Sequence, residues 1–297
     1  MSDQNSEEPV LGNPGPELCD GDPSHTELRE EMLERALAYL GFSSRPEPTV
    51  ETLNEIAKQW SAKMGYDNIC KRIHIGEQRT GAFPIMDPND FFESAILHGT
   101  GGGCWPSGEA AFGLLLSLGF KVDRVAGTML IVGDPLYPAH GAINIEIEGR
   151  TYRMEPSLGA EAALELIDGV RTSHENEAFG LWQDGDCNVW WRPGHSRTAI
   201  ETTIKLYGLS SAFFYYRNEA TKRHSVFNNS IYIRRNRNKG SLTYARGKLI
   251  EISEAGNMSA VEVDPKDVGP LLIESFGLSE HIVDQLPADR EGVSFDA

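Results

Sequence analysis

The 297-residue chain is predicted to be an α+β protein, because helical and strand patterns occupy different parts of it. Apolar residues recur at helical spacing up to about residue 118, and they alternate with polar residues in the segment that follows. The last third mixes both patterns. A hydrophobic content of 40% is enough to bury a core, as one large domain or as two to three lobes.

Four helices are predicted in the first part of the chain. The first spans about 26–40 and ends at Gly41, which suits a left-handed C-terminal position. The second begins after Thr49. A short helix over 88–97 has Asp87 as its N-cap, and a buried helix follows a proline at 106 and runs to about 118. The rest of the segment 71–92 is ambiguous.

Strands are predicted over 122–132 and 143–147, where isoleucines alternate with polar residues. The turn Glu148-Gly149 leads into a partner strand at 151–154. Residues from about 160 to 200 give no assignment. Further strands are predicted in the last part of the chain, which ends with a helix over 265–276 that stops at Gly277. These strands are 230–234, 242–245 and 248–252.

Charge and the N-terminal segment limit the class of protein. Residues 1–25 are acidic and proline-containing, so a disordered tail is predicted. They lack the basic start and apolar core of a signal peptide, and no apolar stretch approaches the roughly 20 residues that span a bilayer. The formal net charge of −17 argues against nucleic-acid binding. We expect a cytoplasmic protein that binds neither nucleic acid nor membrane.

One cysteine stands out among the four in the chain. None forms a CxxC pair, so no metal site is predicted. Cys104 follows a run of glycines and begins a helix, whose N-terminal partial charge favours the reactive thiolate. The glycines allow a substrate close to the backbone, and backbone N–H groups there suit an oxyanion. The alternative is a buried cysteine beside a flexible loop.

The predicted hairpin brings a histidine and a carboxylate together. With a two-residue loop at 148–149, Ala142 lies opposite Glu155, so His140 and Glu155 are diagonal neighbours on one face. A carboxylate fixes the histidine tautomer and supports the imidazolium formed when it takes a thiol proton. We therefore predict Cys104, His140 and Glu155 as catalytic residues. A surface pair without function is the alternative.

The sequence resembles the arylamine N-acetyltransferase family over about residues 26–286. The family's Arg-Gly-Gly-x-Cys motif corresponds to 100–104, its strand-initial histidine to His140, and its Asp-Val-Gly-Phe-Gly motif to 155–159. Other segments that resemble the family are 33–53, 214–218, 227–229 and 242–249. The chain departs from the family pattern at four places. They are Thr100 for arginine, Trp105-Pro106 for an aromatic residue and glutamate, Glu155 for aspartate, and Leu158 for an aromatic residue.

The resemblance implies a helical bundle, a central β-barrel and a C-terminal α/β lid around a papain-like, cysteine-protease-like core. It divides the chain after the tail 1–25 into three parts. A helical lobe over 26–105 ends at the nucleophile, a helix plus β-barrel over 106–205 carries the histidine and the carboxylate, and the lid covers 206–297.

The resemblance also implies an activity. Acetyl-CoA, or another acyl-CoA, acylates Cys104, and an amine acceptor then takes the acyl group in a ping-pong reaction, as an arylamine N-acetyltransferase or an amide synthase does. The co-substrate is acyl-CoA, with no bound cofactor or metal. Two alternatives are a transglutaminase- or papain-like amide hydrolase and a non-catalytic module on the same fold. The implied substrate-binding residues are Gly103, Thr128, Leu158, Gly159 and Phe214.

A basic segment lies between residues 220 and 250, where no acidic residue occurs. Such a cluster suits the phosphates of coenzyme A or an acidic acyl-carrier protein, which is the alternative acyl donor. A solvated surface hairpin is the other interpretation. Its members are Lys222, Arg223, Arg234, Arg235, Arg237, Lys239, Arg246 and Lys248.

Overall fold

The computed structural model describes residues 26–78, 83–129, 138–167, 182–184, 188–191, 200–237 and 240–290. The predicted disordered tail and the predicted end of a strand at 130–132 lie outside these ranges. The helices are α1 (Glu30–Leu40), α2 (Val50–Lys63), α3 (Ile69–Gly76), α4 (Pro88–His98), α5 (Cys104–Ser117), α6 (Ser211–His224), α7 (Val268–Phe276) and α8 (Glu280–Val283), with short 3₁₀ turns at Val226–Asn228 and Pro265–Asp267.

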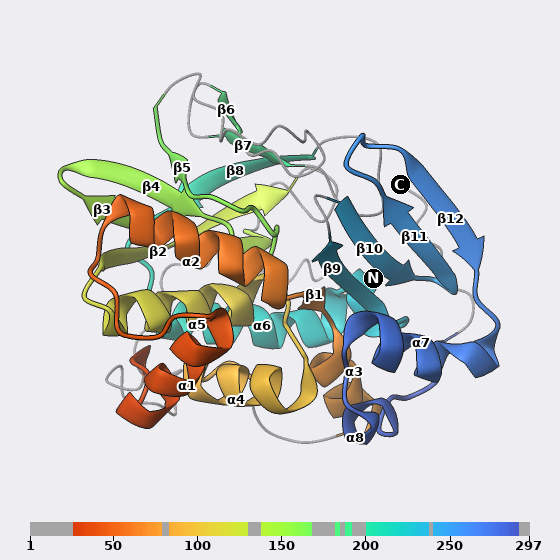
Figure 1. The fold of residues 1–297 in the computed structure, drawn as a ribbon. Helices are drawn as coiled ribbons and strands as arrows, with labels where there is room; N and C mark the ends of the chain where they lie inside the picture. Colours follow the sequence, from red (N-terminus) through yellow and green to blue (C-terminus); the bar gives the residue numbers. More distant parts are fainter. Residues whose placement is uncertain are drawn as a thin grey trace, which may run out of the picture.

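The strands form two antiparallel sheets that lie side by side (Figure 1). The seven-stranded sheet has the order β5-β4-β3-β2-β8-β7-β6, and the five-stranded sheet has the order β1-β9-β10-β11-β12. The strands are β1 (Tyr66–Asp67), β2 (Lys121–Met129), β3 (His140–Ile147), β4 (Arg150–Met154), β5 (Leu164–Glu165), β6 (Trp182–Asp184), β7 (Asn188–Trp191), β8 (Ile200–Leu206), β9 (Tyr232–Arg237), β10 (Gly240–Ala245), β11 (Lys248–Ile252) and β12 (Met258–Glu262).

The expected central β-barrel is an open, curled half-barrel. Within the described residues, the edge strands β5 and β6 are not paired with each other. They are two and three residues long, so neither offers a ladder long enough to close the sheet. The α+β class is confirmed, while the closed barrel is not found.

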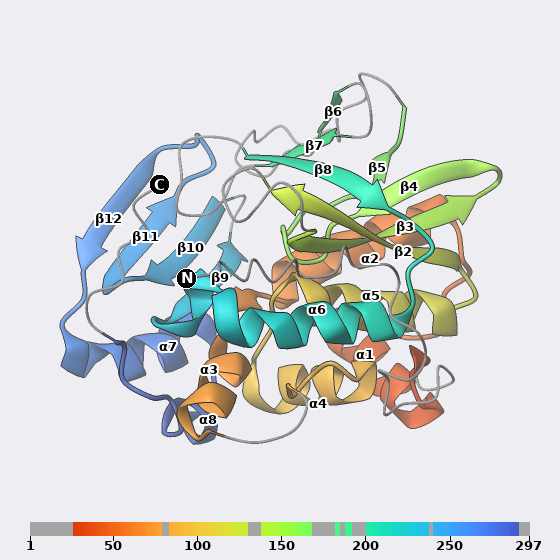
Figure 2. The same ribbon diagram turned by 180° about the vertical axis from the view of Figure 1, so that it is seen from behind.

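Helix α5 is the centre of the main core. It packs against the strands β2 and β3 and against the helices α4 and α6. Figure 2 shows α6 running along it. Its residues are almost all buried, which explains the apolar run that predicted it. The helices of the first part pack on this core, with α1 contacting both α2 and α4.

The predicted helix ends are confirmed by local chemistry. The Thr49 side chain accepts the N–H of Thr52 at the start of α2, and Asp87 accepts the N–H of Asn89 at the start of α4. Gly41 and Gly277 end α1 and α7 in the left-handed conformation, at φ 96° and 73°.

The predicted hairpin register is also confirmed. Ile147 pairs with Arg150 and Ile143 with Met154, and the two turn residues have φ of 50° and 76°, as a type I′ turn requires. The apolar face of this hairpin belongs to the main core. The opposite face therefore carries the even-numbered residues of β3 and the odd-numbered residues of β4.

Several elements were missed from the sequence. Helix α3 lies in the ambiguous segment. Strands β5 to β7 lie in the unassigned range of about 160 to 200, and β8 begins at its end. Helix α6 begins after Ser210, whose side chain caps it, and it has no strong amphipathic pattern. Strand β12 has exposed residues at most positions because it is an edge strand. No helix in the described part of the chain is long and apolar enough to cross a bilayer.

Candidate active site

Cys104 is the first residue of α5, with Gly103 as the N-cap. The backbone N–H groups of Trp105 and Gly141 hydrogen-bond to its sulfur. The thiol also reaches the carbonyl oxygen of Ala139, at 3.8 Å. The helix start predicted at Cys104 is confirmed. The beginning of β3 meets it at this sulfur.

His140 and Glu155 meet on the face that the hairpin register predicted. The His140 Nε2 lies 2.7 Å from Glu155 Oε2, and both side chains are almost fully buried, at 1% and 0% exposed. With Nε2 occupied by the carboxylate, the Nδ1 of the ring is left for Cys104. A hydrogen bond between the histidine and the cysteine side chains completes the row of three.

The charges in this row favour an ion pair of thiolate and imidazolium. Burial, the largest influence, raises the pKa of Cys104, but the hydrogen bond and charge of His140 and the two backbone N–H groups outweigh it, so the pKa is lowered. Burial lowers the pKa of His140, yet the charge of Glu155 and the hydrogen bonds to Glu155 and Cys104 raise it to about 10. The arrangement can supply an activated nucleophile with its proton donor beside it.

The loop before Cys104 is held by a second buried acid. Asp67 of β1 accepts the N–H of Gly101 at 2.5 Å and that of Ile69 at 3.2 Å. Arg235 of β9 lies 3.8 Å from the same carboxylate and donates to the carbonyl of Gly99. Thus one acid and one guanidinium hold the main chain immediately before the nucleophile.

Two of the three glycines in this loop serve packing. A Cβ at Gly101 would lie 1.9 Å from the carbonyl oxygen of Gly65, and one at Gly102 would crowd the side chains of Pro106 and Phe91 at 3.0 and 3.1 Å. A Cβ at Gly103 would meet nothing within 4 Å. The close approach expected between glycine backbone and substrate is therefore open at Gly103 alone.

A family model described as N-acetyltransferase matches residues 49–283. This chain belongs to the arylamine N-acetyltransferase family. No curated protein sequence matches it.

Solved arylamine N-acetyltransferases share its fold. The enzyme from Mycobacterium abscessus is 17% identical, with a TM-score of 0.71 over 86% of this chain and 93% of that one. The Nocardia farcinica enzyme is 18% identical, with a TM-score of 0.70 over 89% and 96%. An arylamine N-acetyltransferase from Bacillus cereus, whose catalytic triad is a unique Cys-His-Glu, is 13% identical, with a TM-score of 0.63 over 84% and 100%.

The predicted substrate-binding residues lie in different surroundings. Gly103 is open, while Thr128 of β2 is buried and lies opposite a threonine of β8. Leu158 is buried in a small apolar cluster. Phe214 of α6 is fully buried, with its ring 5.1 Å from that of Trp105. Gly103 thus faces open space, whereas Thr128, Leu158 and Phe214 are packed inside the protein.

Gly159 contacts β9 of the other sheet. Its φ is 72°, and a Cβ there would lie 2.7 Å from Asn236 of β9. Its carbonyl accepts hydrogen bonds from the side chains of Ser61 and Asn236, both at 2.8 Å. Its neighbour Leu158 receives a further hydrogen bond from Arg234. The segment after Glu155 is therefore fixed against β9.

Two residues beside Cys104 were missed from the sequence. Tyr66 and Lys71, from β1 and α3, both interact electrostatically with the cysteine. Burial lowers the pKa of Lys71 to about 7, although the charge of Cys104 opposes this shift. Its Nζ lies 5.8 Å from the ring centroid of Phe83. No local pattern marks either residue, because α3 itself was not predicted.

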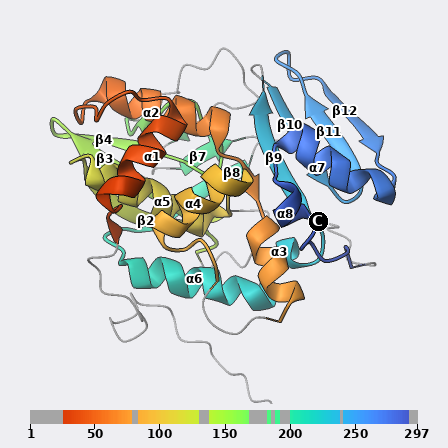
Figure 3. The same ribbon diagram turned by 60° about the horizontal axis from the view of Figure 1, so that its bottom comes forward.

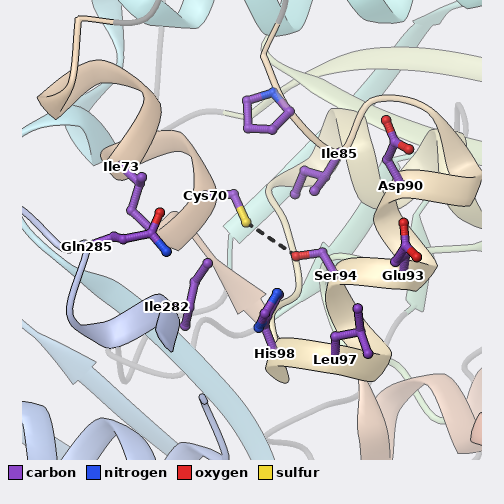
Figure 4. Close-up of a pocket in the computed structure, with 11 residues that line it drawn as sticks. Cys70, Ile73, Ile85, Asp90, Glu93, Ser94, Leu97, His98, Ile282 and Gln285 are labelled. Carbon is purple, nitrogen blue, oxygen red and sulfur yellow. Dashed lines mark hydrogen bonds between the residues drawn. The ribbon is translucent and has the colours of Figure 1, made fainter. Parts of the chain in front are cut away.

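Cys70 occupies a pocket of its own, about 340 Å³ in volume, between α3, α4 and α8 (Figure 4). Figure 3 shows α3 and α8 next to each other beside the five-stranded sheet. The Cys70 thiol lies 3.6 Å from the hydroxyl of Ser94. Burial, with the nearby charge of Asp67, raises its pKa to about 11, so this thiol is a poor nucleophile at neutral pH. Cys19 and Cys187 lie outside the described residues.

At least four of the eight residues of the basic segment contact other groups of the protein. Arg234 and Arg235 are buried and donate to backbone carbonyls, and Arg237 donates to the carbonyl of Ser275. Lys248 is paired with Glu262 at 3.0 Å. Arg234 and Arg235 are therefore part of the folded interior, whereas Arg237 and Lys248 lie at the surface.

Proposed function

We propose that this protein is an acyltransferase that moves an acyl group, in the first place acetyl, from acyl-CoA through a thioester on Cys104 to an amine acceptor. The observation that carries the proposal is the row of the half-buried Cys104 and the buried His140 and Glu155, in which the thiolate and the imidazolium are both favoured. Membership of the arylamine N-acetyltransferase family supports it.

In the first half of the reaction, the Cys104 thiolate attacks the thioester carbonyl of acyl-CoA. A carbon–sulfur bond to Cys104 forms, the bond to the coenzyme sulfur breaks, and the imidazolium of His140 gives its proton to the leaving thiolate. The backbone N–H of Trp105, which lies at the sulfur, is placed to stabilise the negative oxygen of the intermediate.

In the second half, an amine attacks the Cys104 thioester. The new carbon–nitrogen bond replaces the carbon–sulfur bond, His140 takes the proton from the amine nitrogen, and the thiolate returns. Glu155 holds the imidazole ring in one tautomer and offsets its charge in both halves. A Cys-His-Glu triad in the Bacillus cereus enzyme supports glutamate in this role.

Substrates would reach the sulfur past Gly103, where a Cβ would meet open space. Thr128, Leu158 and Phe214 are buried, and together with Gly159 they would shape the acceptor side. The chain needs no bound cofactor for this chemistry. An acyl-carrier protein remains the alternative donor, and the three-part division at 105 and 205 stays a prediction.

The test is the release of coenzyme A from acetyl-CoA, measured with and without an arylamine or hydrazine. We expect release that depends on the amine, together with an N-acetylated product. Hydrolysis of an amide substrate without any amine would favour the hydrolase alternative. Neither reaction, with a Cys104 that alkylates no faster than a free thiol, would favour a non-catalytic module.

A further inference from the structure

Arg153 is a buried cation beside the candidate triad with no role in the chemistry described above. It lies on β4, two residues before Glu155, so both side chains project from the same face of the strand. Its side chain is 0% exposed, and its Nη1 lies 3.5 Å from Glu155 Oε1. Glu155 therefore has His140 on one oxygen and Arg153 facing the other.

In the described part of the chain, the charged partner of the Arg153 guanidinium is the Glu155 carboxylate. Its Nε donates to the side-chain oxygen of Asn144 at 2.6 Å, from the facing position of β3. Its two terminal nitrogens and Glu155 Oε1 make no other hydrogen bond. A buried charge without a partner is costly, so the placement of Arg153 against Glu155 needs the negative charge of that carboxylate.

The charges of the site balance only when Arg153 is counted. Cys104 and Glu155 are the two negative groups of the working ion pair, and His140 supplies one positive charge. Arg153 supplies the second. Removing it would leave the Glu155 carboxylate held by His140 alone, so that the carboxylate could turn away from the imidazolium that stabilises the thiolate.

We propose that Arg153 is a positioning residue of the active site: it fixes the Glu155 carboxylate between two cations and thereby maintains the thiolate of Cys104. This inference rests on the proposed function of the triad. Glutamate is one methylene longer than the aspartate of the family motif, and a second anchor restricts where the longer side chain can point.

The test is a double-mutant cycle read by the rate of Cys104 alkylation with iodoacetamide at pH 7, which needs no substrate. Arg153→Met should slow alkylation about tenfold, because a Glu155 carboxylate that is no longer fixed against His140 supports the imidazolium and the thiolate less, by about one pKa unit. In a Glu155→Gln background, Arg153→Met should change the rate less than twofold, since the anchor has lost its carboxylate. Arg153→Lys should recover part of the rate.

Loss of stability is controlled separately. Arg124 of β2 is another buried arginine, and its carboxylate partner is Glu109, at 2.7 and 2.8 Å, rather than a member of the triad. Arg124→Met should destabilise the fold similarly, yet its effect on alkylation should be equal in the wild-type and Glu155→Gln backgrounds. Should Arg153→Met not fold, Asn144→Ala frees the guanidinium while keeping its charge, and we expect a loss of about threefold that again disappears in Glu155→Gln.

Two outcomes separate this inference from the function it rests on. If Glu155→Gln alone leaves alkylation unchanged, the triad itself is wrong. If Glu155→Gln slows alkylation while Arg153→Met has no effect, or has the same effect in both backgrounds, the triad stands and the role of Arg153 is overturned.

Discussion

The two sides of the candidate site are each held by one buried acid and one buried arginine, but the acids act on different things. On the nucleophile side, Asp67 hydrogen-bonds to backbone N–H groups and Arg235 to a backbone carbonyl. On the base side, Glu155 hydrogen-bonds to the imidazole of His140, a side chain that titrates. The first pair holds the main chain in place, whereas we propose that the second pair, Glu155 with Arg153, sets which proton state is favoured.

The two sides of the site also belong to different sheets. Arg235 belongs to the five-stranded sheet and Glu155 follows a strand of the seven-stranded sheet, so each sheet supports one half of the site. Damage to the nucleophile side should therefore appear first as lost stability. Damage to the base side should appear first as lost reactivity.

Glu155→Gln should have the largest effect. The charge of Glu155 is the main influence that raises the pKa of His140, so without it the imidazolium is lost and the thiolate with it. We expect acyl-transfer turnover to fall about ten-thousandfold, as when the acid of a comparable triad is neutralised. Steady-state kinetics on protein with an unchanged circular dichroism spectrum measures this. A loss below tenfold would contradict the assigned role.

Arg235→Met should destabilise the nucleophile side of the site. It leaves Asp67 buried without its cation, which typically costs about 3–5 kcal/mol of unfolding free energy. Chemical denaturation measures this cost. The matched control is Arg237→Met on the same strand, where an exposed side chain should cost less than about 0.5 kcal/mol. Equal losses in the two variants would show that the Asp67–Arg235 pair has no special part in the fold.

The two described free thiols should differ by about a hundredfold in alkylation rate at pH 7, because thiolate fraction governs the rate. The pKa of Cys104 is lowered, while burial raises that of Cys70 to about 11. Peptide mapping after a short iodoacetamide treatment should find the label on Cys104. Preferential labelling of Cys70 would mean that the helix start and His140 do not activate the thiol.

Lys71→Met should have the smallest effect, with a direction that depends on pH. The pKa of Lys71 is lowered to about 7, so its positive charge is present below that pH and lost above it. Only the charged form favours the Cys104 thiolate. Alkylation should therefore slow about threefold at pH 6 and change little at pH 8. An effect of equal size at both pH values would remove Lys71 from the electrostatics of the site.

Features that depend on a short stretch of sequence were predictable, whereas contacts between distant segments were not. The hairpin register follows from a two-residue turn and strict alternation, so the meeting of His140 and Glu155 was predictable. Arg153 was missed although the same alternation places it on the face of Glu155. The pairing of Asp67 with Arg235 joins distant segments, β1 and β9, and no local pattern contains it. Strands β6 to β8 carry no clean alternation, which left the extent of the half-barrel unpredicted.

The central claim is that Cys104 carries the acyl group, and the mass of the intact protein after incubation with a panel of acyl-CoA donors tests it most directly. We predict one acetyl adduct with acetyl-CoA, mapped to Cys104, absent from Cys104→Ser and discharged by an added amine. A wild-type protein left unmodified by every donor, or an adduct that persists in Cys104→Ser, would contradict the account.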